Sequence, residues 1–408
     1  MKKVLVIGYV YPEPNSSAAG THILSIMRRF LKEDWSVEFA TPAQESEHAI
    51  DLESEGITSQ SIILNCDSFD RYITAYQPDI VLFDRFMMEE QFGWRVEKNS
   101  PTALKILDTE DLQCLRNARH QAHKAKRECT KTDLFSDLAK REIAAILRCD
   151  ISLIISSYEM KLLTETFKVD SSLLHYLPFM VNLEQLPKQS KSFEERQHFM
   201  TIGNFRHAPN WDVVLHLQEI WQKIRKKLPK AELHIYGSYP PPKAMTLHNP
   251  KTGFHIKGWA EDVQEVMQNA RVCLAPIRFG AGIKGKLLDA MINQIPSVTT
   301  TIGSEGMHEE QQSWGGAIED DIEAFVDASV ALYLQEEVWK KAVENTKNIL
   351  DTKYNGNKLG NALIDKIMAV EESLAEHRLN NFTGSMLKHH SMQSTKYMSQ
   401  WIAEKNKD

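Results

Sequence analysis

The sequence lacks several features that mark simple protein classes. It has five cysteines, an odd number, and no two of them have the spacing of metal ligands: they are Cys66, Cys114, Cys129, Cys149 and Cys273. This pattern favours a reduced, cytoplasmic protein. No stretch approaches the about 20 apolar residues of a membrane span, so we expect any membrane contact to be peripheral. The net charge of −7 argues against a general nucleic-acid binder.

Several motifs of nucleotide and metal chemistry are missing as well. The first apolar run, residues 4–10, resembles a signal peptide, but Gly8 interrupts it and no small-residue cleavage site follows, so we expect a buried strand there. The segment after it has no G-x-G-x-x-G fingerprint, and the chain has no Walker A loop, D-x-D or H-x-x-x-H pattern. These absences weaken the dehydrogenase, NTPase and zinc-enzyme interpretations.

What the sequence does contain is an alternation of short apolar runs with amphipathic stretches. Residues 20–33 and 131–149 have helical spacing of apolar residues. The apolar runs of the first half are residues 3–10, 36–41, 61–65, 79–84, 102–108, 151–156 and 173–179. Nearly continuous apolar strands separated by helices predict parallel sheets covered on both faces.

The alternation stops near residues 181–197, a polar and proline-flanked stretch that we interpret as a linker, and then restarts. We therefore predict an α/β protein with two doubly wound Rossmann-like domains that face a cleft. The expected domains are residues 1–185 and residues 198–355. Residues 356–408 would form C-terminal helices and a tail that lies on the N-terminal domain, on a partner or on a membrane surface, or is weakly ordered.

The stretch IRFGAGIKGKLLDAMINQIPSVTTT, residues 277–301, indicates an anion site. It reads as strand end, glycine-rich turn and helix, where free N–H groups and the helix dipole attract a phosphate. Its glycines and cations are Gly280, Gly282, Gly285, Arg278, Lys284 and Lys286. In the alternative interpretation, Lys286 and Asp289 form a surface ion pair and Lys284 extends into solvent.

The glycine-rich stretch and the residues that follow it, as far as GSEGM, resemble the donor-binding region of retaining, family-4-type glycosyltransferases. Three upstream segments support this resemblance: IGNFRHAPNWD, AELHIYGS and FHIKGWAEDV. The resemblance covers residues 198 to about 335 and is weaker in the first half of the chain. It implies the GT-B architecture, which consists of two Rossmann-like domains.

The resemblance also implies roles for individual residues on the donor side. Asp289 takes the position of the acidic residue that binds the ribose hydroxyls. Ala281 stands where the family usually has a glutamate that touches the sugar, so the residue that replaces this glutamate is open. An arginine and a lysine that usually follow the first strand of this domain are missing, with Arg206 nearby. Lys284 and Lys286 are then expected to hold the donor diphosphate, together with Gly280, Gly282, Arg278 and Arg206.

Other residues are candidates for the rest of the cleft. Ala19 and Gly20 correspond to a small-residue loop that faces the cleft, or belong to an ordinary strand–helix turn. Gly258 and Trp259 follow a strand where the family holds the base; Trp259 is equally compatible with a core position. Asp108, Asp111 and Arg116 follow the fifth strand and are candidate catalytic residues, although Asp108 or Asp111 could also cap a helix.

The function that the resemblance implies is transfer of a sugar from a nucleoside-diphosphate sugar to a saccharide or lipid-linked acceptor, with retention and without a metal or other cofactor. Surface polysaccharide or glycoconjugate biosynthesis is the expected context, in the cytoplasm and in peripheral contact with the inner membrane face. The alternatives are a catalytically impaired nucleotide-binding subunit of the same fold, and an epimerase or phosphorylase.

Overall fold

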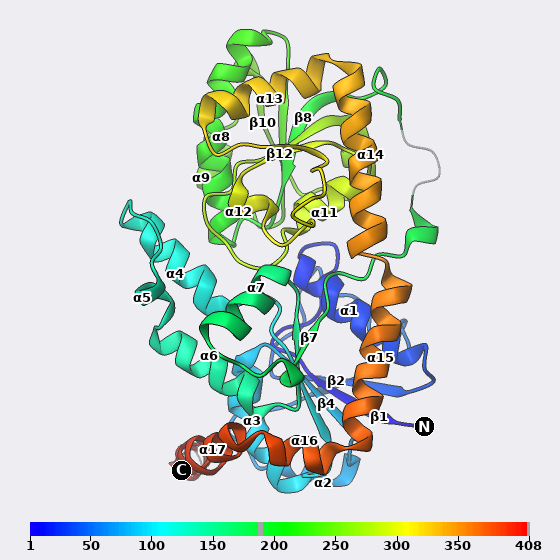
Figure 1. Cartoon of the computed structure of the whole chain (residues 1–408), viewed down its shortest axis with the longest axis vertical. Helices are drawn as coiled ribbons and strands as arrows, with labels where there is room; N and C mark the ends of the chain where they lie inside the picture. The colour runs from blue at the N-terminus through cyan, green and yellow to red at the C-terminus, as the bar shows by residue number, and fades with distance from the viewer. Residues whose placement is uncertain (187–190, 406–408) are drawn as a thin grey trace.

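The protein consists of two α/β halves stacked along its long axis (Figure 1). The computed structural model describes residues 1–186 and 191–405, except for the side chains of residues 390–392. Residues 187–190 of the predicted linker and residues 406–408 of the predicted tail lie outside this description. The predicted fold class, two doubly wound domains, is confirmed.

The N-terminal half is built on a seven-stranded, all-parallel sheet. In spatial order its strands are β3 (Thr58–Ser61), β2 (Ser36–Thr41), β1 (Lys3–Ile7), β4 (Ile80–Asp84), β5 (Leu104–Asp108), β6 (Ile151–Ile154) and β7 (Leu174–Tyr176). Its helices are α1 (Ala18–Leu31), α2 (Ser68–Tyr76), α3 (Phe86–Asn99), α4 (Gln113–Lys124), α5 (Lys131–Leu134), α6 (Asp137–Arg148) and α7 (Ser157–Lys161). The central strands β4 and β5 are buried along their whole length, as their apolar runs predict.

The C-terminal half has a six-stranded, all-parallel sheet. In spatial order its strands are β10 (Phe254–Gly258), β9 (Leu233–Tyr236), β8 (Gln197–Ile202), β11 (Ala270–Ala275), β12 (Ser297–Thr299) and β13 (Gly316–Ile318). Its helices are α8 (Ala208–Lys227), α9 (Pro242–Met245), α10 (Val263–Asn269), α11 (Gly285–Ile292), α12 (Thr301–Ser304), α13 (Ile322–Leu334) and α14 (Glu336–Lys353).

Two expected elements differ from the structure. The strand expected at residues 61–65 lies at Thr58–Ser61 instead, because the chain pairs there as an exposed sheet edge and buries only Ile62 beyond it. The helix expected at residues 131–149 is broken after Leu134. Ser136 begins a new helix by accepting a hydrogen bond from the Ala139 N–H (3.2 Å).

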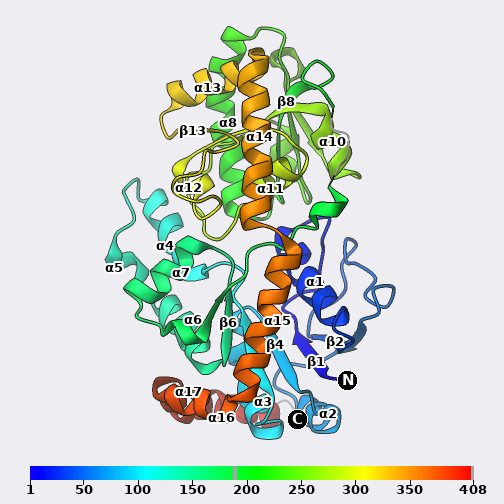
Figure 2. The ribbon, with the colours of Figure 1, turned by 45° about the vertical axis from the view of Figure 1, so that its right-hand side comes forward.

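The last three helices, α15 (Gly356–Glu372), α16 (Leu374–Asn380) and α17 (Phe382–Lys405), return to the N-terminal half. Figure 2 shows α14 along the upper half and α15 continuing down the lower one. Leu363 and Ile367 of α15 pack into the core that surrounds β1. The Arg378 guanidinium forms an ion pair with the buried Asp150 carboxylate (2.8 Å). Among the described residues, no helix combines the length and apolarity needed to cross a lipid bilayer.

Candidate active site

The carboxyl ends of the two sheets face each other, and the loops that follow them meet directly. Ser16 Oγ lies 3.0 Å from Ser238 Oγ of the other half. The Arg119 guanidinium of α4 forms a two-pronged ion pair with Glu305 (2.8 Å for each N–O contact). Ligands of doubly wound folds bind at this end of the sheet, so the candidate site lies between the halves.

Two glycines of the predicted anion loop are held against the N-terminal half. A Cβ atom on Gly282 would lie 2.8 Å from the Asp111 Cβ, and one on Gly285 would lie 2.5 Å from the Ala18 Cβ. Gly282 also has a φ of +61°, which disfavours a side chain. These two glycines therefore allow the two halves to approach each other closely. A Cβ atom on Gly280 would have no neighbour closer than 4.0 Å.

Lys284 is buried in this contact. Its ammonium donates to the Gly282 carbonyl (2.8 Å). Burial lowers the pKa of Lys284 to about 8, and the nearby carboxylates of Glu305, Glu159 and Asp111 oppose that shift. The interpretation of Lys284 as a solvent-extended side chain is therefore wrong.

Lys286 and Asp289, one turn apart on α11, carry opposite charges without pairing. Burial lowers the pKa of Lys286 to about 8 and raises that of Asp289 to about 7. Among the described residues, neither side chain forms a hydrogen bond or an ion pair. The surface ion pair considered from the sequence is therefore not formed. Two half-buried, unpaired groups of opposite charge are expected where a ligand supplies the partners.

The two arginines predicted to bind the phosphates contact other side chains. Arg278 forms a two-pronged ion pair with Asp212 (2.9 and 2.6 Å), so its charge is already compensated. The Arg206 guanidinium lies 3.5 Å above the ring of Tyr239. Arg206 nevertheless reaches the wall of a cavity in the cleft, and Arg278 does not.

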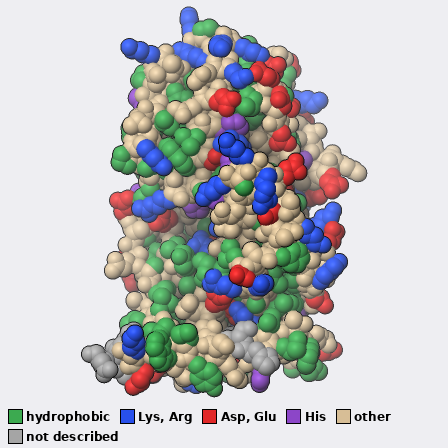
Figure 3. Space-filling view, turned by 90° about the vertical axis from the view of Figure 1, so that its left-hand side faces the viewer, with side chains coloured by type: hydrophobic (Ala, Val, Ile, Leu, Met, Phe, Trp, Pro, Cys, Tyr) green, Lys and Arg blue, Asp and Glu red, His purple; other side chains and the backbone are tan. Residues whose placement is uncertain are grey.

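This cavity of about 300 Å³ opens between α4 and the first turn of α8. Figure 3 looks onto this side of the molecule and shows basic and acidic side chains near the boundary between the halves. The cavity is lined by Gln113, Arg116, Asn117, His120, Leu138, Arg206, His207, Ala208, Pro209 and Phe279. Burial lowers the pKa of His207, and the cations Arg116, Arg85 and Lys286 lower it further against the opposing Asp111 carboxylate, so cations of both halves lie near this side chain. The convergence suits an anionic ligand.

The N-terminal wall of the cleft carries a group of buried carboxylates around Arg85. Burial and the Asp84 carboxylate raise the pKa of Asp108 to about 7. Burial raises the pKa of Glu110 well above its usual value, with further contributions from Asp108 and Asp84. Glu110 has a φ of +60°, a strained conformation for a residue with a side chain. Buried acids of raised pKa can hold or accept a proton near neutral pH.

The predicted catalytic residues divide into two environments. Asp108 lies below the cleft, with its Oδ1 3.7 Å from Nε2 of the buried His22. Asp111 and Arg116 are partly exposed and form an ion pair (2.6 Å). The interpretation of either aspartate as a cap of α4 is wrong, because Glu142 accepts hydrogen bonds from the N–H groups of the helix's first two residues.

The remaining predicted residues lie near the cleft with different neighbours. Ala19 and Gly20 are in the first turn of α1, and Gly20 packs against the backbone of Glu13 (2.6 Å for an added Cβ). Gly258 ends β10 with a φ of +75°. Trp259 stacks on His48 of the N-terminal half, with ring centroids 4.1 Å apart and planes 5° from parallel. A core position for Trp259 is therefore wrong.

Sequence reasoning missed Glu159, which occupies the centre of the domain contact. This fully buried carboxylate of α7 accepts from the N–H groups of Gly282 (2.9 Å) and Leu112 (3.0 Å). Burial raises the pKa of Glu159 to about 8. Its oxygen contacts the glycine-rich loop at Gly282, next to Ala281, which packs against the N-terminal core. A π-helical segment, Leu162–Thr166, follows α7, and such irregularities are frequent near functional sites.

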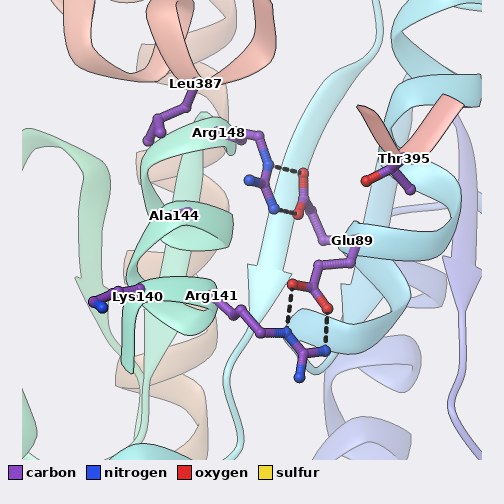
Figure 4. Close-up of a pocket in the computed structure, with 8 residues that line it drawn as sticks. Glu89, Lys140, Arg141, Ala144, Arg148, Leu387 and Thr395 are labelled. Carbon is purple, nitrogen blue, oxygen red and sulfur yellow. Dashed lines mark hydrogen bonds and ion pairs between the residues drawn. The ribbon is translucent and has the colours of Figure 1, made fainter. Parts of the chain in front are cut away.

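A second cavity, of about 320 Å³, lies far from the cleft between α3, α6 and α17. Figure 4 shows the Arg148 and Glu89 side chains directed toward each other, while Lys140 points away from them. Glu89 accepts two hydrogen bonds from Arg148, one of 2.8 Å, and Glu90 pairs with Arg141 (2.6 Å). Since these charges compensate each other, the second cavity does not compete with the cleft as an active site.

Comparison with known proteins agrees with this geometry. Residues 196–335 match the family model described as "Glycosyl transferases group 1". No curated protein sequence matches the chain.

Solved structures match over nearly the whole chain. TarM from S. aureus, crystallised with UDP among its ligands, is 11% identical with a TM-score of 0.69, covering 90% of this chain and 99% of TarM. HepE from Anabaena, in complex with UDP and glucose, is 9% identical with a TM-score of 0.67, covering 90% and 100%. WaaG, a glycosyltransferase involved in lipopolysaccharide biosynthesis, is 13% identical with a TM-score of 0.62, covering 88% and 98%. The chain thus has the GT-B fold, and the match of residues 196–335 supports a place among the GT-B glycosyltransferases.

Proposed function

We propose that the protein transfers a sugar from a nucleoside-diphosphate sugar to a saccharide or lipid-linked acceptor, with retention of configuration. The observation that carries this proposal is the pair Lys286 and Asp289 on α11. Both side chains are half-buried, burial shifts the pKa of each, and neither has a hydrogen-bond or ion-pair partner among the described residues. A diphosphate beside Lys286 and ribose hydroxyls beside Asp289 would compensate both groups.

The chemistry follows from charge. A departing nucleoside diphosphate gains negative charge in the transition state, so a fixed cation stabilises that state more than the bound substrate. Lys286 lies in the first turn of α11, where the helix dipole adds to its field. Arg206 on the cavity wall adds to this positive field, and Arg116, which is paired with Asp111, lies on the same wall.

The acceptor is proposed to bind on the N-terminal side of the cleft. Asp111 and Arg116 are the exposed polar groups there, and Asp108 and Glu110 form the buried layer below them. In the retaining mechanism that the sequence resemblance implies, a phosphate oxygen of the donor takes the acceptor proton. The N-terminal residues would then orient the acceptor, and neither a protein nucleophile nor a metal is required.

Surface polysaccharide or glycoconjugate biosynthesis is the proposed context, in the cytoplasm with peripheral contact to the inner membrane face. Phe382, Tyr397 and Trp401 of α17 are 71%, 61% and 61% exposed. Exposed aromatic side chains on a terminal helix are compatible with an interfacial contact.

The test is a thermal-shift screen with nucleoside diphosphates and their sugars, followed by a transfer assay with the stabilising sugar nucleotide. UDP is the first probe because TarM and HepE were crystallised with it. A ligand at 100 times its Kd should add about 2.7 kcal/mol to the free energy of unfolding. Stabilisation by a sugar nucleotide with transfer of its sugar supports the proposal. Binding without transfer to any saccharide or lipid-linked acceptor would identify a non-catalytic subunit.

The ribose assignment has its own test. Asp289→Ala should bind a nucleoside diphosphate and its ribose-modified analogue with equal affinity, whereas the wild-type protein should prefer the intact ribose. Asp212→Ala is the control, since Asp212 pairs with Arg278 outside the cavity. Preserved discrimination in Asp289→Ala would exclude contact with the ribose.

A further inference from the structure

A cluster of histidines lies on the C-terminal sheet, away from the cleft. His198, His234 and His255 come from the adjacent strands β8, β9 and β10, and His234 and His255 are direct neighbours in the strand register. Each alternates with core residues, so all three project from the sheet face opposite the main core. Glu232 directly precedes β9 and points to the same place.

The ring nitrogens of this cluster are poorly satisfied. His234 Nε2 lies 2.8 Å from Glu232 Oε2, which is a good hydrogen bond. His255 Nε2 lies 3.7 Å from the same oxygen, too far for one. Within the part of the chain that the structure describes, His255 Nε2, His234 Nδ1 and His198 Nε2 are buried without a hydrogen-bond partner. Buried polar atoms normally have partners, and of these three atoms His255 Nε2 is the one that faces the Glu232 carboxylate without reaching it.

The separations fit a metal ion. One ligand atom each from Glu232, His234 and His255 can be chosen so that all lie within 4.8 Å of one another. A tetrahedral ion with bonds of about 2.05 Å holds its ligands about 3.3 Å apart, and the separations from Glu232 Oε2, 2.8 and 3.7 Å, bracket that value. Imidazole nitrogens with one carboxylate suit zinc and related transition metals better than calcium or magnesium.

We propose that Glu232, His234 and His255 bind one divalent transition-metal ion, with zinc as the best match. Three protein ligands leave the fourth position to water, and Glu232, whose side chain is 51% exposed, provides the path for entry. His198 stacks on His234 (3.8 Å between centroids) and holds that ring in place. Positive groups nearby are Lys257, which is exposed, and Arg225; His248 also lies beside His255, where its Nδ1 accepts a hydrogen bond from the Ile256 N–H (3.2 Å).

The ion would have a structural role. β10 is the edge strand of its sheet, and a metal shared by His234 and His255 ties it to β9. Ser238, which contacts the N-terminal half, lies four residues beyond His234, about 13 Å along an extended chain. The site is therefore separate from the proposed transfer reaction and does not depend on it.

The test uses the full-length, untagged, chelator-treated protein. Zinc is titrated in competition with a chromophoric chelator, and melting is followed with and without zinc. We expect one zinc ion per chain and a higher Tm with zinc. His234→Ala, His255→Gln and Glu232→Gln should each weaken zinc binding by more than about 100-fold, because loss of an outer-shell partner alone costs up to that much. The zinc-dependent rise in Tm should disappear with them.

His389→Ala, on α17, is the matched control and should bind zinc as the wild type does. Melting without zinc checks that each variant is folded, and His255→Gln keeps a polar side chain at its position if His234→Ala does not fold. No saturable zinc binding by the wild-type protein would overturn the proposal. Unchanged binding in the folded ligand variants, or an equal loss in His389→Ala, would overturn it as well.

Discussion

The two walls of the cleft place their ionisable side chains in different environments. On the C-terminal wall, Lys286 and Asp289 are half-buried and make no ion pair with any described residue. On the N-terminal wall, Asp84, Asp108 and Glu110 crowd around Arg85, and burial, reinforced by their mutual repulsion, raises the pKa of the latter two acids. The first arrangement would be completed by the proposed ligand, whereas the second is stabilised by retaining protons.

This difference indicates which wall binds the charged part of the substrate. A group whose pKa is shifted by burial alone lacks a protein partner, so a bound anion or hydroxyl can change its environment strongly. The N-terminal acids already interact with one another and with the Arg85 guanidinium, so a ligand changes their environment less. We therefore expect donor binding to depend on single residues of α11, and the N-terminal wall to tolerate single changes better.

The strongest test of this comparison is the pair Lys284 and Lys286. Lys286→Ala should weaken binding of the preferred nucleoside diphosphate by about 1.5–3 kcal/mol, the range of charge-assisted hydrogen bonds. Lys284→Ala should weaken it less, because the Lys284 amine already donates to Gly282. Titration calorimetry measures both. Because the pKa of Lys286 lies at about 8, the affinity should also fall as the pH rises through that value.

Lys340→Ala, on the exposed face of α14, is the control for a general loss of positive charge. Equal losses in Lys284→Ala and Lys286→Ala would mean that Lys284 leaves Gly282 when the donor binds. Unchanged affinity in Lys286→Ala would exclude α11 as the site that binds the diphosphate.

The next effect concerns the ion pair that joins the two walls. Arg119→Ala and Glu305→Ala should each lower the free energy of unfolding by about 1–3 kcal/mol, because each leaves a mostly buried charge without its partner. The double variant should lose clearly less than the sum of the two. Urea unfolding measures all three. Additive losses would show that the two side chains act independently.

A smaller effect is expected from Glu159 and depends on pH. Burial raises the pKa of its carboxyl to about 8, so its contribution to stability is present below pH 4 and is lost as the pH rises from about 4 to about 8. Glu159→Gln keeps an oxygen for the Gly282 and Leu112 N–H groups and removes the ionisation. Its stability relative to the wild type should therefore increase between pH 5 and pH 8, by no more than about 1.4 kcal/mol per pH unit.

Glu337→Gln, on the surface of α14, is the control and should show no such change. Parallel pH profiles of Glu159→Gln and the wild type in urea unfolding would mean that Glu159 titrates normally.

Much of this architecture could be predicted from the sequence, because parallel strands buried on both faces leave a strong pattern. β4 and β5 lie within one or two residues of the apolar runs that predict them. β3 could not be found in this way, since its residues Thr58–Ser61 are all exposed and carry no apolar signal.

The part of the candidate site that lies within one segment of the chain can be predicted from the sequence. Lys286 and Asp289 belong to a local turn–helix pattern, and the structure leaves both available. Arg278 belongs to the same pattern, but its partner Asp212 lies 66 residues away, so no local rule could predict that its charge is compensated. Glu159 lies 123 residues from Gly282. Such pairings arise from the packing of one domain on the other and leave no periodic signal.

The smallest expected effect tests whether the walls are also joined by the rings of Trp259 and His48. Their stacking across the cleft should be worth about 0.5–1.5 kcal/mol, as for other aromatic pairs. His48→Ala should destabilise the ligand-free protein by that amount. If Trp259 changes partner and stacks on the base of the donor, the loss in His48→Ala should shrink once the nucleotide is bound. Trp259 fluorescence of the wild type and of His48→Ala, with and without the nucleotide, measures this exchange. An identical loss of stability in His48→Ala with and without the nucleotide would mean that Trp259 stays stacked on His48 and does not contact the donor.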